Sequence, residues 1–226
     1  MSSFIVIEGL IGVGKTSLCR LLHRELKARL VLEPAKDNPF LANFYADRDR
    51  YAFPAQMFYL ATRFAQYSDL MQTKLFSDLV VADYLFEKDQ LFARHTLIDH
   101  ELALYQRFAD LLGDKVPCPD FILFLDAPTE VIQERIARRA IDAEQVIEPG
   151  YLDTLRERYF ELWTEWEGCP IYVLDTSSID YVDSVSDQQW MLEVIRGWLD
   201  GKPLAGAPQP FRKVVVEQLG LFGQVG

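Results

Sequence analysis

Cysteine is scarce in this chain of 226 residues, and its three cysteines are far apart. Cys19, Cys118 and Cys169 form no C-x-x-C pair, so they indicate neither a disulfide framework nor a zinc site. An odd number of separated cysteines is typical of a protein kept in a reducing compartment, and we therefore expect a cytoplasmic location.

Basic residues are also in short supply, since 23 lysines and arginines face 34 acids and the formal net charge is −11. A nucleic-acid-binding protein needs a basic surface to displace counterions, so no nucleic acid partner is expected. Long apolar runs and a signal-peptide pattern are missing, so no membrane partner is expected either. An acidic protein can still bind ATP where its positive groups are concentrated at one site.

The most specific motif is a phosphate-binding loop at residues 9–16, which matches the pattern G-x-x-x-x-G-K-[ST]. An apolar run precedes it and leucines at helical spacing follow it, which is the strand–loop–helix context that the motif requires. Its glycines let backbone N–H groups close around a polyphosphate. Lys15 supplies a charge for the β- and γ-phosphates, and Thr16 a hydroxyl for Mg²⁺. The predicted ATP-binding residues of this loop are Gly9, Gly12, Val13, Gly14, Lys15, Thr16 and Ser17.

Five short apolar segments predict five β-strands, and helical patterns separate them. Segments without polar alternation are typical of parallel strands that are buried on both faces. The sequence therefore predicts an α/β protein with a five-stranded parallel sheet flanked by helices on both faces. The expected strands span residues 4–7, 30–32, 79–82, 121–125 and 171–174. The expected helices span residues 39–45, 52–75, 88–112, 129–140, 149–166 and 188–199.

No internal repeat or low-complexity stretch interrupts residues 1–200, which we expect to form a single domain. Residues 201–226 contain glycine and proline and form a C-terminal tail whose role the sequence leaves open.

Acidic residues end two of the expected strands, at the edge where open α/β sheets bind ligands. Glu33 precedes Pro34, which disfavours helix at Glu33 and keeps it extended. Glu33 is placed to take a proton from an acceptor hydroxyl, and Asp83 to hold Mg²⁺ directly or through water. Acids at strand ends also cap helices, but beside a phosphate loop these two favour roles in phosphoryl transfer.

Three arginines cluster on one side of the expected helix at residues 129–140. Arg138 and Arg139 follow Arg135 by three and four positions. Such residues also favour the negative end of a helix, but in so acidic a chain the cluster favours a lid over a triphosphate. We predict that Arg135 and Arg139 bind ATP and that Arg139 contributes to catalysis.

Together these motifs resemble the deoxyribonucleoside kinase family, and within it the bacterial deoxyadenosine/deoxyguanosine kinase branch. The resemblance extends to about Leu199 and is carried by Glu8–Ser17, Glu33-Pro34, Asn38-Pro39-Phe40, Phe44-Tyr45, Phe53–Gln56, Arg63 and residues 83–89. It implies a P-loop kinase fold and a homodimer. It also implies phosphorylation of a deoxynucleoside, with deoxyadenosine or deoxyguanosine preferred, at its 5′-hydroxyl, with Mg²⁺ and with ATP as the donor.

The resemblance also implies site residues. Glu33 would be the general base on the 5′-hydroxyl, and Asp83 would lie with the metal and the phosphates. Gln56 and Arg63 are seven positions apart on one expected helix, or roughly 10 Å, so both can face one elongated pocket. The substrate-binding residues that it implies are Glu33, Tyr45, Gln56, Arg63, Asp89 and Glu144. Gln56, Arg63 and Asp89 would contact the base, and Tyr45 and Glu144 the sugar 3′-hydroxyl.

Two positions depart from the family pattern. Tyr84 stands where many members have an arginine, so a positive group near the reacting phosphate is missing there. The lid usually reads arginine, glycine, arginine, whereas this chain has Arg139-Ala140-Ile141.

Other nucleotide-binding proteins share the phosphate loop. A nucleoside monophosphate kinase of the thymidylate kinase type has an ionised phosphate as acceptor and gains little from a carboxylate base, so Glu33 favours a hydroxyl acceptor. A regulatory module of the GTPase type would carry an Asn-Lys-x-Asp run, which this sequence lacks. A noncatalytic relative would lose Lys15 or Glu33. The sequence does not settle which nucleobase is preferred.

Overall fold

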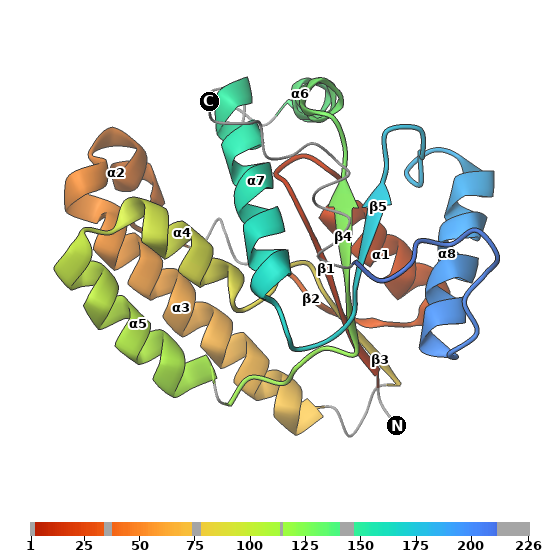
Figure 1. Cartoon of the computed structure of the whole chain (residues 1–226), viewed down its shortest axis with the longest axis horizontal. Helices are drawn as coiled ribbons and strands as arrows, with labels where there is room; N and C mark the ends of the chain where they lie inside the picture. The colour runs from red at the N-terminus through yellow and green to blue at the C-terminus, as the bar shows by residue number, and fades with distance from the viewer. Residues whose placement is uncertain (1–2, 34–37, 74–77, 114, 141–146, 212–226) are drawn as a thin grey trace.

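The computed structural model describes residues 3–33, 38–73, 78–113, 115–140 and 147–211, and its centre is one parallel sheet (Figure 1). The strand order is β2-β3-β1-β4-β5, and every neighbouring pair is parallel. The strands are β1 (Ser3–Gly9), β2 (Arg29–Val31), β3 (Leu79–Ala82), β4 (Phe121–Asp126) and β5 (Ile171–Asp175). The predicted strands and the α/β class are confirmed.

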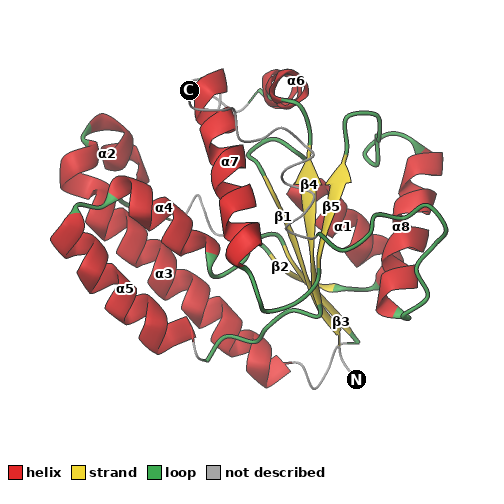
Figure 2. Ribbon diagram, viewed as in Figure 1, coloured by secondary structure: helices red, strands yellow, loops and turns green. Residues whose placement is uncertain are grey.

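The sheet divides the helices into two groups, as Figure 1 shows. Helices α1 (Lys15–Leu26) and α8 (Val185–Leu199) lie on one side of it. On the other side lie α3 (Arg48–Thr73), α4 (Lys88–Thr96), α5 (Asp99–Gly113) and α7 (Pro149–Glu165). The remaining helices are α2 (Leu41–Ala46), which follows β2, and α6 (Thr129–Arg139), which follows β4. Figure 2 shows loops joining strands to helices at both ends of the sheet.

The central strands are apolar without alternation because helices cover both of their faces. Every residue of β3 and β4 is buried, as are six of the seven residues of β1. The single buried acid within β1 is Glu8, whose side chain is fully inaccessible. Parallel strands place their carboxyl ends at one edge, so the residues that follow β1, β2 and β3 converge there.

The predicted helical region at residues 88–112 is confirmed, and the structure divides it into two helices, α4 and α5. Leu97 closes α4 in an extended conformation, with φ −98° and ψ 140°, and its N–H bonds to the Ala93 carbonyl. Asp99 then begins α5, where an acidic side chain favours the positive end of the helix dipole. Both helices pack against α3, so their apolar positions continue one pattern across the break. Helix α3 itself begins at Arg48, earlier than predicted.

The described part of the C-terminal tail packs on the edge strand β5. Pro210 forms an antiparallel bridge with Tyr172, and the Phe211 N–H donates to the Ile171 carbonyl at 2.6 Å. The Phe211 ring also contacts the Phe160 ring of α7, with 5.9 Å between centroids. Residues up to 211 therefore cover backbone groups that an edge strand would otherwise expose. Among the described residues no helix is both long enough and apolar enough to span a membrane.

Candidate active site

At key positions the phosphate-binding loop has backbone angles and close contacts that only glycine permits. Gly12 and Gly14 have φ of 82° and 113°, in the region that side chains avoid. A Cβ atom on Gly9 would lie 2.4 Å from the Leu125 carbonyl oxygen, and one on Gly14 2.3 Å from the Tyr181 hydroxyl. Gly14 precedes α1 without a side-chain cap, so the first N–H groups of α1 remain open to an anion.

Lys15 begins α1 and turns back over the loop. Its Nζ donates to the Gly9 carbonyl at 2.8 Å and to the Leu10 carbonyl at 3.0 Å. Burial and the nearby charge of Lys88 lower the pKa of Lys15, although neighbouring acids oppose that shift. Phosphate oxygens are stronger partners for an ammonium than these carbonyls are, so the arrangement suits exchange of the carbonyls for a triphosphate.

Asp83 joins the phosphate-binding loop to the end of β2. Its Oδ2 accepts from the Thr16 hydroxyl at 2.7 Å, and its Oδ1 accepts from the Glu33 N–H at 2.7 Å. A hydroxyl and a carboxylate in contact are oxygen ligands of the kind that Mg²⁺ takes together with substrate phosphates. Among the described residues no group of three His, Cys, Asp or Glu side chains is arranged to hold a metal ion.

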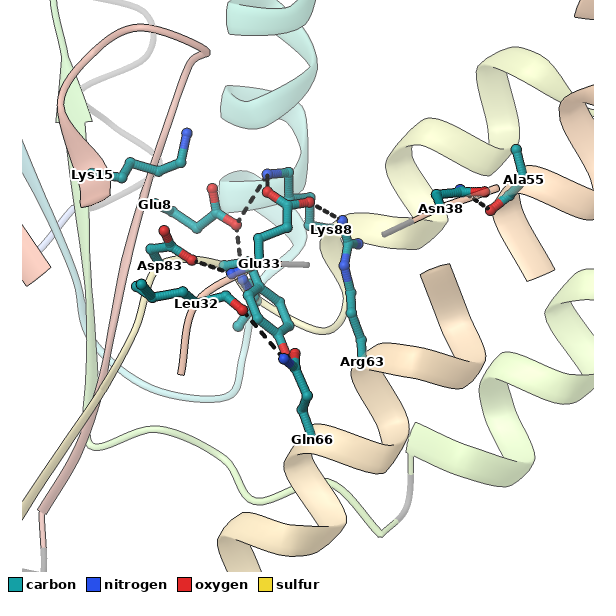
Figure 3. Close-up of polar contacts among 12 residues, drawn as sticks. Glu8, Lys15, Leu32, Glu33, Asn38, Ala55, Arg63, Gln66, Asp83 and Lys88 are labelled. Carbon is teal, nitrogen blue, oxygen red and sulfur yellow. Dashed lines mark hydrogen bonds and ion pairs between the residues drawn. The ribbon is translucent and has the colours of Figure 1, made fainter. Parts of the chain in front are cut away.

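Glu33 lies between two cations from different helices, as Figure 3 shows. Its Oε1 accepts a hydrogen bond from Arg63 of α3, and its Oε2 lies 3.6 Å from the Lys88 ammonium of α4. Burial by itself would raise the pKa of Glu33, but Lys88, Arg63 and Lys15 offset this and hold the pKa at about 2. The Glu33 carboxylate is therefore ionised at any physiological pH.

Arg63 is fixed by aromatic rings as well as by Glu33. The centroids of the Tyr59 and Tyr84 rings each lie 5.2 Å from its guanidinium carbon. The Tyr84 hydroxyl donates to Gln66 Oε1 at 2.6 Å, and Gln66 Nε2 donates to the Leu32 carbonyl at 3.3 Å (Figure 3). Tyr84 thus helps to hold an arginine that comes from another element.

Gln56 lies on α3, two turns before Arg63, as predicted. Its side chain is buried, and its Nε2 donates to the Thr96 hydroxyl at the end of α4 at 3.2 Å. Asn38 Nδ2 donates to the Ala55 carbonyl at 3.1 Å and so joins the segment before α2 to α3 (Figure 3).

Tyr45 and Asp89 lie in α2 and α4, but their side chains are outside the described part of the structure. Glu144 also lies outside the described residues.

A cavity of about 620 Å³ opens beside the phosphate-binding loop. Its lining includes residues 12–17, Arg20, the α6 residues Arg135, Arg138 and Arg139, and residues 177–183. Arg135 donates to the Val13 carbonyl at 3.1 Å and to the Thr176 hydroxyl at 2.9 Å, so it also braces the loop. Arg138 and Arg139 are exposed and line the same cavity.

Comparison with known proteins identifies this arrangement. The family model for deoxynucleoside kinase matches residues 5–199. The chain belongs to the deoxynucleoside kinase family. This membership confirms the predicted family and the phosphotransferase class, and it does not favour the alternative of a nucleoside monophosphate kinase.

This deoxynucleoside kinase has relatives in bacteria and in an amoeba. It is 34% identical to the deoxyguanosine kinase of Bacillus subtilis (strain 168), over 81% of this chain and 91% of that one. It is 30% identical to a deoxyguanosine kinase of Dictyostelium discoideum, over 83% of this chain and 68% of that one. The structure of deoxyadenosine kinase from M. mycoides with bound dCTP has a TM-score of 0.70 at 23% identity, covering 88% and 99% of the two chains. That structural likeness confirms the predicted P-loop kinase fold.

The kinase site contains residues that sequence reasoning missed. Glu8 accepts from the Leu85 N–H at 2.8 Å, the Gly9 N–H at 3.0 Å and the Tyr159 hydroxyl at 2.9 Å. Glu8 and Lys88 both lie in stretches that carry the family resemblance, but sequence reasoning assigned a role to neither of them. An acid directly after an apolar run was a signal for Glu8, whereas Lys88 had no comparable signal. The cavity residues 177–183 follow the carboxyl end of β5, so the rule that placed Glu33 and Asp83 also applied to them.

Proposed function

We propose that this deoxynucleoside kinase transfers the γ-phosphoryl group of Mg-ATP to the 5′-hydroxyl of deoxyguanosine or deoxyadenosine. The observation that carries the proposal is the ionised, partly buried carboxylate of Glu33. The backbone N–H of Glu33 donates to Asp83, which also accepts from Thr16 of the phosphate-binding loop. The relative at 34% identity, a deoxyguanosine kinase, supports a purine substrate. A cytoplasmic location is also proposed, because three cysteines without a C-x-x-C pair are typical of a protein in a reducing compartment.

Glu33 is the general base of the proposed reaction. It takes the proton of the 5′-hydroxyl while that oxygen forms a bond to the γ-phosphorus and the bond from the γ-phosphorus to the β–γ bridging oxygen breaks. Lys15, together with Arg139, stabilises the charge that spreads over the phosphoryl oxygens and the departing ADP. Thr16 and Asp83 would hold Mg²⁺, which neutralises phosphate charge when it is bound.

The proposed nucleoside pocket lies on the α3 side of Glu33. Gln56 and Arg63 would contact the base, together with Asp89, because their amide, guanidinium and carboxylate groups supply both donors and acceptors to a purine edge. Tyr45 and Glu144 are proposed to bind the 3′-hydroxyl. Support comes from α3, which carries Gln56 and Arg63 two turns apart beside Glu33.

A substrate panel tests the proposed reaction. Purified protein with Mg-ATP is given each of the four natural deoxynucleosides and, separately, thymidine monophosphate, and ADP release and product mass are measured. We expect 5′-monophosphates of deoxyguanosine or deoxyadenosine to form fastest. Reaction of the monophosphate alone would contradict the role of Glu33 as base on a hydroxyl.

The pH dependence follows from the ionisation of Glu33. Its pKa in the folded protein is about 2, below the ordinary 4.5, so kcat should show no protonation of Glu33 between about pH 5 and pH 9. The ionised carboxylate stabilises the fold above pH 4.5, and this contribution is lost as the pH falls through 2. Steady-state kinetics across that range check the expectation, and an acid limb with an apparent pKa near 6 would contradict it.

A homodimer through α5 is also part of the proposal. Its support is a set of large apolar side chains exposed on or just before that helix, namely Ile98, Leu104, Phe108 and Leu111. Leu104, Phe108 and Leu111 share one face at helical spacing, and Leu111 is 67% exposed. We expect Leu111→Asp to shift sedimentation from dimer to monomer because it places a charge in an apolar interface.

The matched control for the dimer is Val185→Asp, since Val185 is 78% exposed on α8 and away from α5. This change should leave the dimer intact. A dimer that survives both Leu111→Asp and Phe108→Asp would refute this interface.

A further inference from the structure

Lys88 is a buried cation to which neither the sequence nor the family comparison assigns a role. It begins α4, and only 7% of its side chain is exposed. Its Nζ lies 3.6 Å from Glu33 Oε2 and 3.9 Å from Glu8 Oε1 (Figure 3). The centroid of the Phe92 ring is 5.7 Å from the same Nζ. A buried ammonium is costly unless acids balance it, so its place between these two carboxylates requires an explanation.

The Glu8 end of this contact is rigid. Glu8 is fully buried and accepts three hydrogen bonds, from the backbone N–H groups of Leu85 and Gly9 and from the Tyr159 hydroxyl. These donors belong to three separate parts of the fold, the loop after β3, the phosphate-binding loop and α7. Lys88 is therefore fixed relative to the phosphate-binding loop through Glu8.

The two oxygens of Glu33 have different surroundings. Oε1 accepts a hydrogen bond from Arg63. Oε2 faces Lys88 at 3.6 Å, which is an ion pair longer than a hydrogen bond. Oε2 therefore keeps lone pairs for a further donor, and the nearby charge of Lys88 keeps this oxygen ionised. A substrate hydroxyl is a donor of that kind.

We propose that Lys88 is a positioning residue for phosphoryl transfer. Lys88 is anchored on Glu8 and holds Oε2 of Glu33 toward the acceptor hydroxyl. The proposal rests on the proposed role of Glu33 as the general base. When the hydroxyl proton moves to Oε2, Glu33 becomes neutral and no longer balances Lys88. The positive charge of Lys88 then lies beside the new phosphate monoester. There it stabilises the negative charge that the phosphoryl group has carried from ATP to the acceptor side of the site.

The charged and titratable groups around Glu33 determine what the removal of Lys88 should do. They are Lys15, Arg63, Asp83, Tyr84 and Lys88, with Glu8 on the far side of Lys88. Among the groups that lower the pKa of Glu33, Lys88 has the largest effect. An opposite charge at this range shifts a carboxyl pKa by about one to three units, so without Lys88 the pKa of Glu33 should rise accordingly.

The test compares Lys88→Met and Lys88→Arg with Lys115→Met, which removes an exposed lysine outside the site. We expect Lys88→Met to lower kcat by about 10- to 100-fold, because a base that is misplaced by about 1 Å loses that much. The KM values for ATP and the nucleoside should change by less than about threefold, because the residues that bind them remain. The wild type should show no acid limb of kcat between about pH 5 and pH 9, whereas a rise of up to about three units in the pKa of Glu33 should bring the start of an acid limb to about pH 5 in Lys88→Met. Lys88→Arg should recover part of kcat, and Lys115→Met should match the wild type.

Thermal unfolding of each variant separates positioning from folding, since Lys88 also balances buried Glu8. If Lys88→Met does not fold, Lys88→Cys is compared before and after alkylation with 2-bromoethylamine, which restores an ammonium at nearly the same length. Recovery of kcat on alkylation, with the wild type alkylated as control, would support the proposal.

Three results would overturn the proposal: unchanged kcat and pH profile in Lys88→Met, a raised KM with unchanged kcat, or no recovery of kcat on alkylation of a folded Lys88→Cys. Glu33→Gln is measured alongside. Normal turnover of Glu33→Gln would refute the proposed base itself, whereas impaired Glu33→Gln with normal Lys88→Met would refute only the positioning role.

Discussion

Replacing Lys15 with alanine is expected to lower kcat/KM by about 10³-fold, equivalent to about 4 kcal/mol of transition-state stabilisation. The Lys15 ammonium reaches the carbonyls of Gly9 and Leu10 inside the phosphate-binding loop, where the β- and γ-phosphates are proposed to bind. Charge spreads over the phosphoryl oxygens during transfer, and a fixed ammonium in a buried site stabilises that charge more than water does. Steady-state kinetics with Mg-ATP and deoxyguanosine measure the loss.

The control for this change is Lys115→Ala, which removes an exposed lysine that lies away from the loop. Its kcat/KM should equal that of the wild type. If Lys15→Ala folded and kept its kcat/KM, the mechanism based on the phosphate-binding loop would be wrong.

Replacing Glu33 with glutamine should lower kcat by about 10²-fold or more while ATP affinity stays near normal. The amide keeps the size of the side chain but cannot accept the proton of the 5′-hydroxyl. ATP is proposed to bind at the loop and in the cavity beside α6, which Glu33 does not line. Turnover and equilibrium binding of ATP, measured on the same preparation, give the two quantities.

Glu33→Gln also leaves Arg63 and Lys88 without their shared carboxylate, so Glu33→Asp is the informative companion. Aspartate restores the negative charge, but its side chain is too short to place a carboxylate oxygen at the acceptor hydroxyl, and we expect kcat to stay low. Glu157→Gln, an exposed change on α7, serves as the neutral control. Near-normal turnover of Glu33→Gln would remove Glu33 from the role of base.

Much of the fold was predictable because its signals are local. A strand buried on both faces has an unbroken apolar segment, and all five such segments became strands. The phosphate-binding loop was equally clear, since its glycines are required by backbone angles and close contacts within a short stretch. The break between α4 and α5 was missed because both helices bury apolar residues against α3, so the periodicity alone did not reveal the boundary.

Part of the candidate site could also be predicted from the sequence. Glu33 and Asp83 end neighbouring parallel strands, and parallel strands carry their ends to one edge, so their convergence followed from the predicted sheet. The roles given to Tyr45, Asp89 and Glu144 stay predictions, because those side chains lie outside the described part of the structure.

The sequence by itself determined the α/β class, the phosphate-binding loop and the two acids, since each depends on residues close together or on a regular repeat. Only the tertiary structure decided that Glu33 meets Arg63 and Lys88, and that Lys88 is held in turn by Glu8. These residues come from β1, the end of β2, α3 and α4, and contacts between side chains on separate elements have no spacing rule in a single sequence. Their distances, and therefore the charge balance around the proposed base, exist only once those elements have packed.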